Sequence, residues 1–255
     1  MTDDQDDQTD TLGDILARLS PEAAAEVTII GGQALCVWGD HYLLDQLTGE
    51  EYTHLASDDL DLLGKRHAIE LCAEAWGGQA KFPAFGDQTP NSGVVMIKGA
   101  TGENLSIEFL IAVYGLTDRE VIKFADALPV GDLQIPILSP PLCLKSRINN
   151  LVGLRYAERK QAREVVRVKL AALATRMYIV DHLEQGNVKG ALRIAKYLIR
   201  SVFLTNEARV AYRRYGAEFL HALPDNHGMW PTEAKELEFP KRLLQVRDYL
   251  GIKSE

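Results

Sequence analysis

A change of pattern near residue 138 constrains the fold of this 255-residue chain more than any other feature. After Ser139-Pro140-Pro141 only helical periodicity remains, over about 141–154, 157–184, 187–203, 206–222 and 232–250. Before it, short apolar runs predict strands; these are VTII, LDLL, QAKFPAF, GVVMIKG, NLSIEFLIAV and either VIKFADAL or DLQIPIL. The pattern predicts an α+β chain, with an α/β domain over 11–138 and a helical domain over 139–255.

Helical segments are expected between these strands. TLGDILARL, QALCVWGDHYLL and KRHAIELCAEAWGG have apolar residues at helical spacing, and Ser20-Pro21 is typical of an N-cap and first helical position. The polar residues 45–56 are expected to form a loop, and Trp38 and Trp76 are expected in the core of the α/β domain.

The first ten residues, MTDDQDDQTD, are acidic and polar, which predicts a disordered tail. They lack the basic start and apolar stretch of a secretory signal. No run of eighteen apolar residues occurs, so no contact with a membrane is expected, and the cytoplasm is the expected compartment.

Charge and cysteine usage limit the function classes. Residues 1–138 carry a net charge of −17 and residues 139–255 carry +9. This asymmetry fits a polyanionic partner or two halves that face each other across a cleft, but ordinary solvated helix faces explain it equally well. The wide spacing and odd number of Cys36, Cys72 and Cys143 argue against a disulfide framework and a zinc site.

Two acidic elements are embedded in apolar runs. In a strand, Asp59 and Asp61 project to the same face. Adjacent carboxylates repel each other, and a hard cation such as Mg²⁺ relieves that repulsion. Glu108 stands between Ile107 and Phe109, where a charge needs an ion partner or a metal. An isolated DxD is also common on loops, so the embedded Glu108 is what favours a metal site.

A glycine pair precedes the first long helix. Gly31-Gly32 allows a close approach of the backbone, and the N–H groups at the start of a helix attract anions. A simple turn is the alternative, because a glycine pair by itself is not specific.

The order of these elements resembles the DNA-polymerase-β-type nucleotidyltransferase superfamily. GGQAL followed by SDDLDLL is nearest to the branch of type IV abortive-infection (AbiE-type) nucleotidyltransferase toxins. The resemblance implies a nucleotidyltransferase-like mixed β-sheet flanked by helices. It implies metal ligation and catalysis by Asp59, Asp61 and Glu108 with Mg²⁺ or Mn²⁺, and nucleotide binding by Gly31, Gly32, Ser57 and Lys145.

The resemblance weakens downstream of the strands. RKQAREVVRV matches the branch's Lys- and Asp-containing element only loosely, because Arg167 stands where the second acid is expected. Arg163 and Glu164 match its first two places. This departure leaves open a catalytically inactive module with the same fold, which binds nucleotide or a protein partner.

The partners implied by the resemblance are an NTP, a tRNA or other RNA, and a cognate antitoxin. The implied reaction is transfer of NMP to an RNA or protein acceptor. The implied role is that of a toxin or phage-defence effector. Lys189, Arg193, Lys196 and Arg200 form one basic helix face suited to RNA phosphates. A solvated face or a protein dock explains the same spacing, and a helical RNA-binding protein with an unrelated α/β domain is a further alternative.

Overall fold

The computed structural model describes residues 11–55, 60–99 and 102–252. The predicted acidic tail 1–10, Ser57 and Asp59 lie outside these residues. The chain divides into two compact units. The first comprises Met1–Ala34, Ser57–Val113 and Thr117–Ser139, and the second Leu35–Ala56, Tyr114–Leu116 and Pro140–Glu255.

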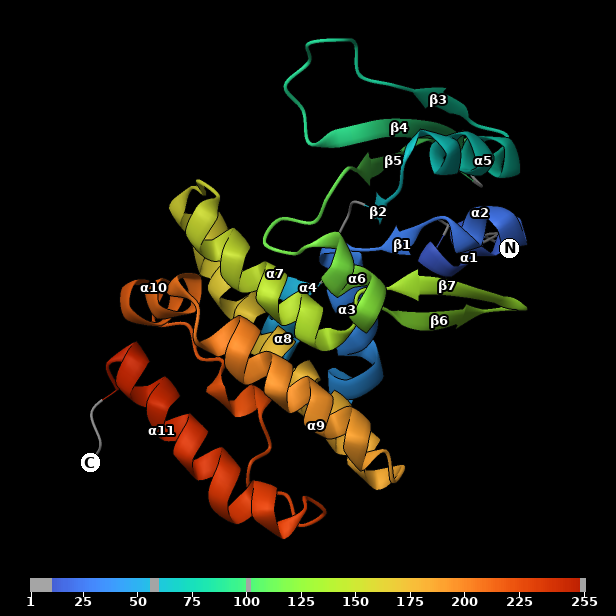
Figure 1. Ribbon diagram of the computed structural model, residues 1–255. Helices are drawn as coiled ribbons and strands as arrows, with labels where there is room; N and C mark the ends of the chain where they lie inside the picture. Colours follow the sequence, from blue (N-terminus) through green and yellow to red (C-terminus); the bar gives the residue numbers. More distant parts are fainter. Residues whose placement is uncertain (1–10, 56–59, 100–101, 253–255) are drawn as a thin grey trace, which may run out of the picture. The chain divides into compact units, whose positions relative to one another are not determined.

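The first unit is built on a seven-stranded mixed sheet (Figure 1). Its strands are β1 (Thr28–Ile29), β2 (Asp61–Leu63), β3 (Gln79–Lys81), β4 (Asn91–Lys98), β5 (Asn104–Leu110), β6 (Asp126–Val130) and β7 (Leu133–Ile137). Their spatial order is β3-β4-β5-β2-β1-β7-β6. The pairs β2–β5 and β1–β7 are parallel, and the other neighbours are antiparallel. The predicted α+β class with a mixed sheet is confirmed.

One face of this sheet is apolar and covered by helices. Ile29, Leu62 and Phe109 stand in one register row on that face, and all three are fully buried. Helix α5 (Arg66–Trp76) packs on β3 and β4, and its Trp76 ring lies 6.4 Å from that of Phe109. Along each strand, the residues just before and just after these three therefore point to the opposite face of the sheet.

Three shorter helices complete the first unit. Helices α1 (Leu12–Ala17) and α2 (Pro21–Ala25) pack against β6 and β7 respectively, and α6 (Asp118–Phe124) precedes β6. The predicted N-cap is confirmed, since Ser20 Oγ accepts a hydrogen bond from the Ala23 amide at 3.1 Å.

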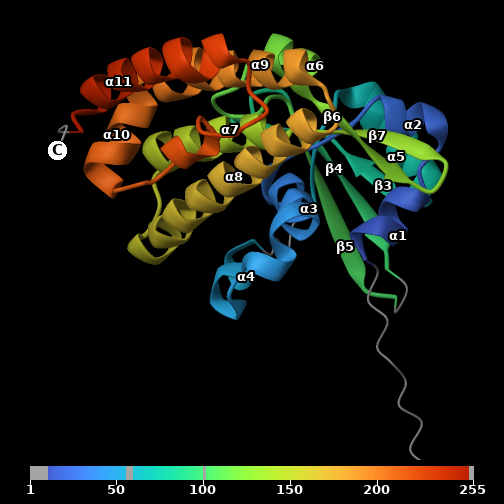
Figure 2. The same cartoon turned by 90° about the horizontal axis from the view of Figure 1, so that it is seen from below.

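The second unit is helical (Figure 2). Its elements are η1 (Leu44–Gln46), α4 (Gly49–Leu55), α7 (Pro140–Gly153), α8 (Glu158–Glu184), α9 (Val188–Tyr197), η2 (Leu198–Phe203), α10 (Asn206–Tyr215), η3 (Leu220–Ala222), η4 (Ala234–Glu238) and α11 (Phe239–Leu250). Helix α8 contacts α4, α7, α9 and η3, so it forms the centre of this unit. None of the described helices is long and apolar enough to cross a membrane.

Helix α3 (Gly31–Leu43) belongs to both units, since its first turn groups with the sheet and Leu35 onward with the helices. Trp38 is buried as predicted, but in the helical unit, where its ring lies 5.8 Å from that of Tyr178. The predicted division at 138/139 kept the whole of 11–138 together, whereas residues 35–56 pack with the helical unit.

Residues 45–56 were predicted to form a loop, and this was wrong for 49–55. Thr48 and Glu51 form a reciprocal cap at the start of α4, with Glu51 N–H donating to Thr48 Oγ1 and Thr48 N–H to Glu51 Oε2, both at 3.2 Å. Of the two candidate strands that precede residue 138, DLQIPIL forms β7. VIKFADAL is divided between α6 and β6. The helix expected over 206–222 ends at Gly216, which is left-handed with φ +64°.

Candidate functional site

Two of the predicted acids are neighbours on adjacent strands. Asp61 on β2 and Glu108 on β5 are direct partners in the parallel pairing, so both side chains project to the face of the sheet opposite the buried apolar row. The backbone fixes this register, since the Glu108 N–H donates to the Leu60 carbonyl at 3.2 Å. Both residues are half-buried. The structure thus brings Asp61 and Glu108 together, while Asp59 lies outside the described residues.

Gly31 lies against the Asp61 carboxylate. It has φ +65°, a conformation that favours glycine, and a Cβ added to it would collide with Asp61 Oδ2. The Ile30 N–H donates to the Asp61 carbonyl at 3.1 Å, which holds the end of β1 beside β2. The first turn of α3, with Gly31 and Gly32, thus starts next to Asp61. Helix N-termini attract anions, so a phosphate at this position would lie close to the acidic pair.

Asn91 is a site residue that sequence reasoning missed. Its side-chain amide donates to Glu108 Oε2 at 3.1 Å and leaves the other oxygen, Oε1, for a different partner. Asn91 begins β4 next to a register shift between Asn91 and Gly93. The adjacent Ser92 hydroxyl donates to the Gly64 carbonyl at 2.6 Å, which anchors this irregular start of the strand. In the sequence, Asn-Ser-Gly before an apolar run indicates a turn. It does not indicate that Asn91 bonds to Glu108.

Lys81 is a second residue that the sequence did not identify as part of the site. It pairs with Val94, which pairs with Glu108, so Lys81, Val94, Glu108 and Asp61 form one row on the same face as the two acids. Lys81 is exposed on the edge strand β3. A flexible cation at the end of an acidic row is suited to an anionic substrate.

The other predicted site residues are distributed as follows. Ser57 and Asp59 lie outside the described residues. Lys145 lies in the helical unit on α7, with its ammonium group 6.0 Å from the centroid of the Tyr197 ring. The four predicted RNA-binding residues are all exposed on α9 and the start of η2; they are Lys189, Arg193, Lys196 and Arg200.

The donor set fits a hard divalent cation in part. Within the described residues no group of three or more His, Cys, Asp or Glu side chains could hold a metal ion. Asp61 and Glu108 nevertheless supply two carboxylates from one face. Mg²⁺ commonly takes one or two protein carboxylates and completes its shell with waters and phosphate oxygens. The pair is therefore compatible with a cation that arrives with a triphosphate.

Glu164, which matched the downstream element of the resemblance, has a structural environment. It is buried in the helical unit, where Oε2 lies 3.3 Å from Arg147 Nη1 and Oε1 lies 3.0 Å from Arg167 Nη1. Arg167 also donates to the His54 carbonyl at 2.8 Å. Two guanidinium groups thus neutralise this carboxylate, and it is not placed as a catalytic base.

Cys72 and Cys143 are buried and Cys36 is half-buried. Burial raises the pKa of Cys36 to about 11 and those of Cys72 and Cys143 to about 12. The nearby Asp40 carboxylate adds to the effect at Cys36. A thiolate nucleophile at neutral pH is disfavoured at all three positions.

Comparison with known proteins gives a similarity to a solved structure. No model of a known protein family matches this sequence, and no curated protein matches it. Among solved structures the chain is similar to the crystal structure of an antigenic nucleotidyltransferase-like protein from Paracoccidioides brasiliensis. The sequence identity is 12% and the TM-score 0.41, over 73% of this chain and 95% of that one. A similarity at this level leaves the function to be inferred from the residues of the site.

Proposed function

We propose that this chain is a metal-dependent nucleotidyltransferase that transfers NMP from an NTP to an acceptor. The observation that carries the proposal is the pairing of Asp61 with Glu108 on adjacent parallel strands, with Gly31 against the Asp61 carboxylate. A buried or half-buried pair of like charges is unfavourable without a cation. An anion-attracting helix start beside that pair supplies a place for the phosphates that accompany such a cation.

Each residue has a separate part in this proposal. Asp61 and Glu108 would hold Mg²⁺ or Mn²⁺, and Asp59 would join them, as the sequence motif implies. Gly31 and Gly32 would let the triphosphate approach the first turn of α3. The Asn91 amide would fix the orientation of the Glu108 carboxylate through its 3.1 Å hydrogen bond. By the same resemblance, Ser57 and Lys145 would contact the nucleotide.

The chemical step is a substitution at the α-phosphorus. The acceptor hydroxyl gives up its proton to solvent water and its oxygen bonds to the α-phosphorus, while the bond from that phosphorus to the α–β bridging oxygen breaks. Pyrophosphate leaves. A bound divalent cation would lower the pKa of the hydroxyl and offset the charge on the triphosphate. The protein's own contribution is to orient the two reactants and to hold fixed dipoles around the reacting phosphate.

The acceptor in this proposal is an RNA, such as a tRNA, or a protein side chain. The likeness of GGQAL and SDDLDLL to the abortive-infection branch favours a toxin or phage-defence effector, paired with an antitoxin. A non-catalytic module would share the fold and the nucleotide site but transfer nothing, so a transfer assay separates the two functions.

The test uses the purified full chain with Mg²⁺ or Mn²⁺, total RNA and each of the common NTPs. Label on the α-phosphate is expected to appear on RNA or on the protein, and label on the γ-phosphate is not. Asp61→Asn and Glu108→Gln are expected to lower transfer by at least about a thousandfold, because both remove charge that contacts the reacting centre.

Matched substitutions outside the site serve as controls. Asp132→Asn lies in the turn between β6 and β7, and Glu74→Gln lies on the solvent side of α5; both residues are exposed. These variants should keep wild-type transfer. Metal-dependent nucleotide binding without transfer would identify the module, and transfer of the γ-label would contradict the proposed chemistry.

A further inference from the structure

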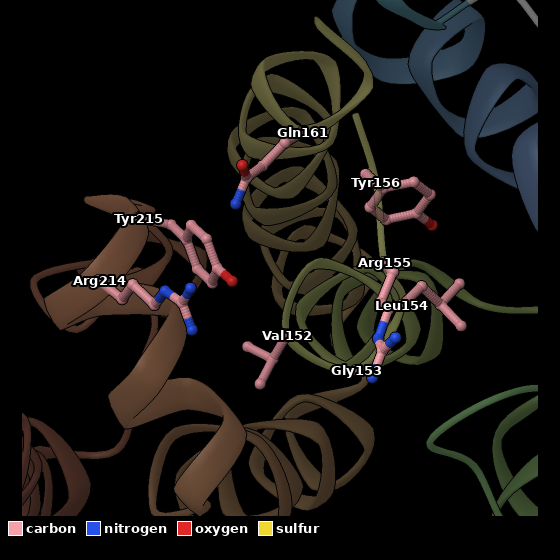
Figure 3. Close-up of a pocket in the computed structure, with 8 residues that line it drawn as sticks. All are labelled: Val152, Gly153, Leu154, Arg155, Tyr156, Gln161, Arg214 and Tyr215. Carbon is pink, nitrogen blue, oxygen red and sulfur yellow. The ribbon is translucent and has the colours of Figure 1, made fainter. Parts of the chain in front are cut away.

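A hollow in the helical unit has no part in the proposed transfer site. It has a volume of about 410 Å³, within the range of pockets that hold small ligands. Its walls come from the end of α7, the link to α8, the first turns of α8 and the end of α10 (Figure 3). The residues that line it are Val152, Gly153, Leu154, Arg155, Tyr156, Gln161, Arg214 and Tyr215.

The chemistry of these walls is cationic and aromatic. None of the eight residues that line the hollow is acidic, and two of them, Arg155 and Arg214, are arginines on different segments. The Arg214 guanidinium lies 5.3 Å from the centroid of the Tyr215 ring. Figure 3 shows Arg214 and Tyr215 on one wall and Arg155 on another, so a bound anion could be approached from both sides. Arginine forks match phosphate oxygens in geometry as well as charge.

The remaining walls suit a planar heterocycle. The ring of Tyr215 offers a stacking surface, and the Gln161 amide offers a donor and an acceptor to a base edge. Val152 contributes an apolar contact. A nucleotide carries a phosphate, a base edge and a π-face within one small molecule, and this set of walls has a counterpart for each.

Two of the helices that form the hollow, α7 and α8, are joined by a buried ion network. Arg147 on α7 and Arg167 on α8 both lie against the Glu164 carboxylate, at 3.3 Å and 3.0 Å. Burial, and then the Glu164 carboxylate, raise the pKa of Tyr156. That network holds α7 and α8 together. The link that carries Arg155 and Tyr156 is therefore anchored at both ends, and a pocket with fixed walls loses less entropy on binding.

The surroundings of the hollow are also basic. Arg159 and Lys160 follow on the exposed first turn of α8, and Arg213 precedes Arg214 on α10. Glu158 is the acid next to them on α8. Arg213 is fixed by donating from Nε to the Leu250 carbonyl at 2.8 Å. The excess of positive charge would draw a phosphate-bearing ligand toward the opening.

We propose that this hollow is a second nucleotide-binding site, in which Arg155 and Arg214 hold a phosphate and the base stacks on Tyr215. The ligand is a free nucleotide or one nucleotide of a single strand, since the contacting chemistry is the same. The site is independent of the proposed transfer reaction, because none of its residues belongs to the row of Asp61 and Glu108 on the sheet.

The test measures binding to the full chain by fluorescence anisotropy, with EDTA present so that metal-dependent binding on the sheet is absent. The probes are a fluorescent AMP derivative and a labelled short oligoadenylate. Arg155→Ala and Arg214→Ala should each weaken binding about tenfold or more, as expected when charge-assisted hydrogen bonds are removed. Tyr215→Ala should weaken it about tenfold while Tyr215→Phe keeps it, because stacking needs the ring and not the hydroxyl.

Arg242→Ala, in the same unit but outside the lining, is the matched control and should change binding by less than about twofold. Thermal unfolding of each variant checks its fold. Arg155 and Arg214 are exposed, so their replacement by Ala is not expected to prevent folding. Binding of both probes assigns a free-nucleotide site, and binding of the strand alone assigns a strand site. Failure of both probes to bind, equal loss with Arg242→Ala, or equal competition by an acidic peptide would overturn the proposal.

Discussion

The two units of this protein use carboxylates in opposite ways. In the helical unit Glu164 has a side-chain exposure of 6% and lies between two guanidinium groups, at 3.3 Å and 3.0 Å. In the sheet unit Asp61 and Glu108 are half-buried, and the register places two like charges side by side. Glu108 accepts a hydrogen bond from a neutral amide, that of Asn91.

This difference separates a structural acid from a candidate ligand-binding one. The charge of Glu164 is balanced by the fold itself, so its removal should affect folding. Asp61 and Glu108 are neighbours of like charge in the register, so their removal should affect binding and chemistry first.

The largest effect on stability is expected at Glu164. Glu164→Ala leaves Arg147 and Arg167 buried without their anion, and breaking a buried pair in this way costs about 3–5 kcal/mol of unfolding free energy. Urea unfolding measures the loss. Glu158→Ala, at the exposed first turn of the same helix, should stay within about 0.5 kcal/mol of wild type. A loss below about 1 kcal/mol at Glu164 would remove the contrast between the two units.

A smaller effect is expected at Gly31, and a second glycine isolates its cause. Gly131 has φ +57° with no heavy atom within 4 Å of an added Cβ, so Gly131→Ala should lose only the backbone strain, about 1–2 kcal/mol. Gly31→Ala has the same strain plus the collision with Asp61. It should lose more stability than Gly131→Ala and should also lose nucleotide transfer. Equal losses at the two glycines, with transfer intact, would show that the contact with Asp61 has no functional weight.

The smallest effect concerns the basic face on α9. Arg193→Ala and Lys196→Ala should weaken RNA binding only modestly and lower the salt dependence, by about one in the log–log slope for each phosphate that the variant no longer neutralises. Anisotropy titrations at several salt concentrations measure this. Unchanged slopes would mark this helix face as an ordinary solvated surface. Of the two nucleic-acid or nucleotide sites proposed for the helical unit, the Arg155–Arg214 hollow would then remain.

The sheet faces of Asp61 and Glu108 were predictable because their signals are local, whereas the pairing of their two strands was expected only from the family resemblance. Alternation in SIEFLI gives the face of Glu108, and the apolar run LDLL gives the strand of Asp61. The Ser20 cap was predictable for the same reason, since the residues involved are three positions apart.

Long-range pairing explains what the sequence did not reveal. The bond from Asn91 to Glu108 depends on the β4–β5 register and its shift, and the row position of Lys81 depends on β3 pairing with β4. Periodicity in α3 predicted that Trp38 is buried but not that it packs on Tyr178 in the helical unit. Glu164 matched a motif loosely, and only the packing of α7 on α8 reveals its two arginine partners.

The most direct test of the central claim is the stability of Asp61→Asn with and without ligand. Unfolding free energies are measured for wild type and variant, in EDTA and with Mg²⁺ plus a non-hydrolysable NTP. Wild type should gain about 2.7 kcal/mol at a ligand concentration a hundredfold above Kd. In EDTA, Asp61→Asn should be as stable as wild type or up to about 1 kcal/mol more stable, because a like-charge repulsion is removed. It should lose the gain from ligand. A variant that is destabilised in EDTA but keeps the full gain from ligand would contradict the account, because Asp61 would then be structural and not part of the nucleotide site.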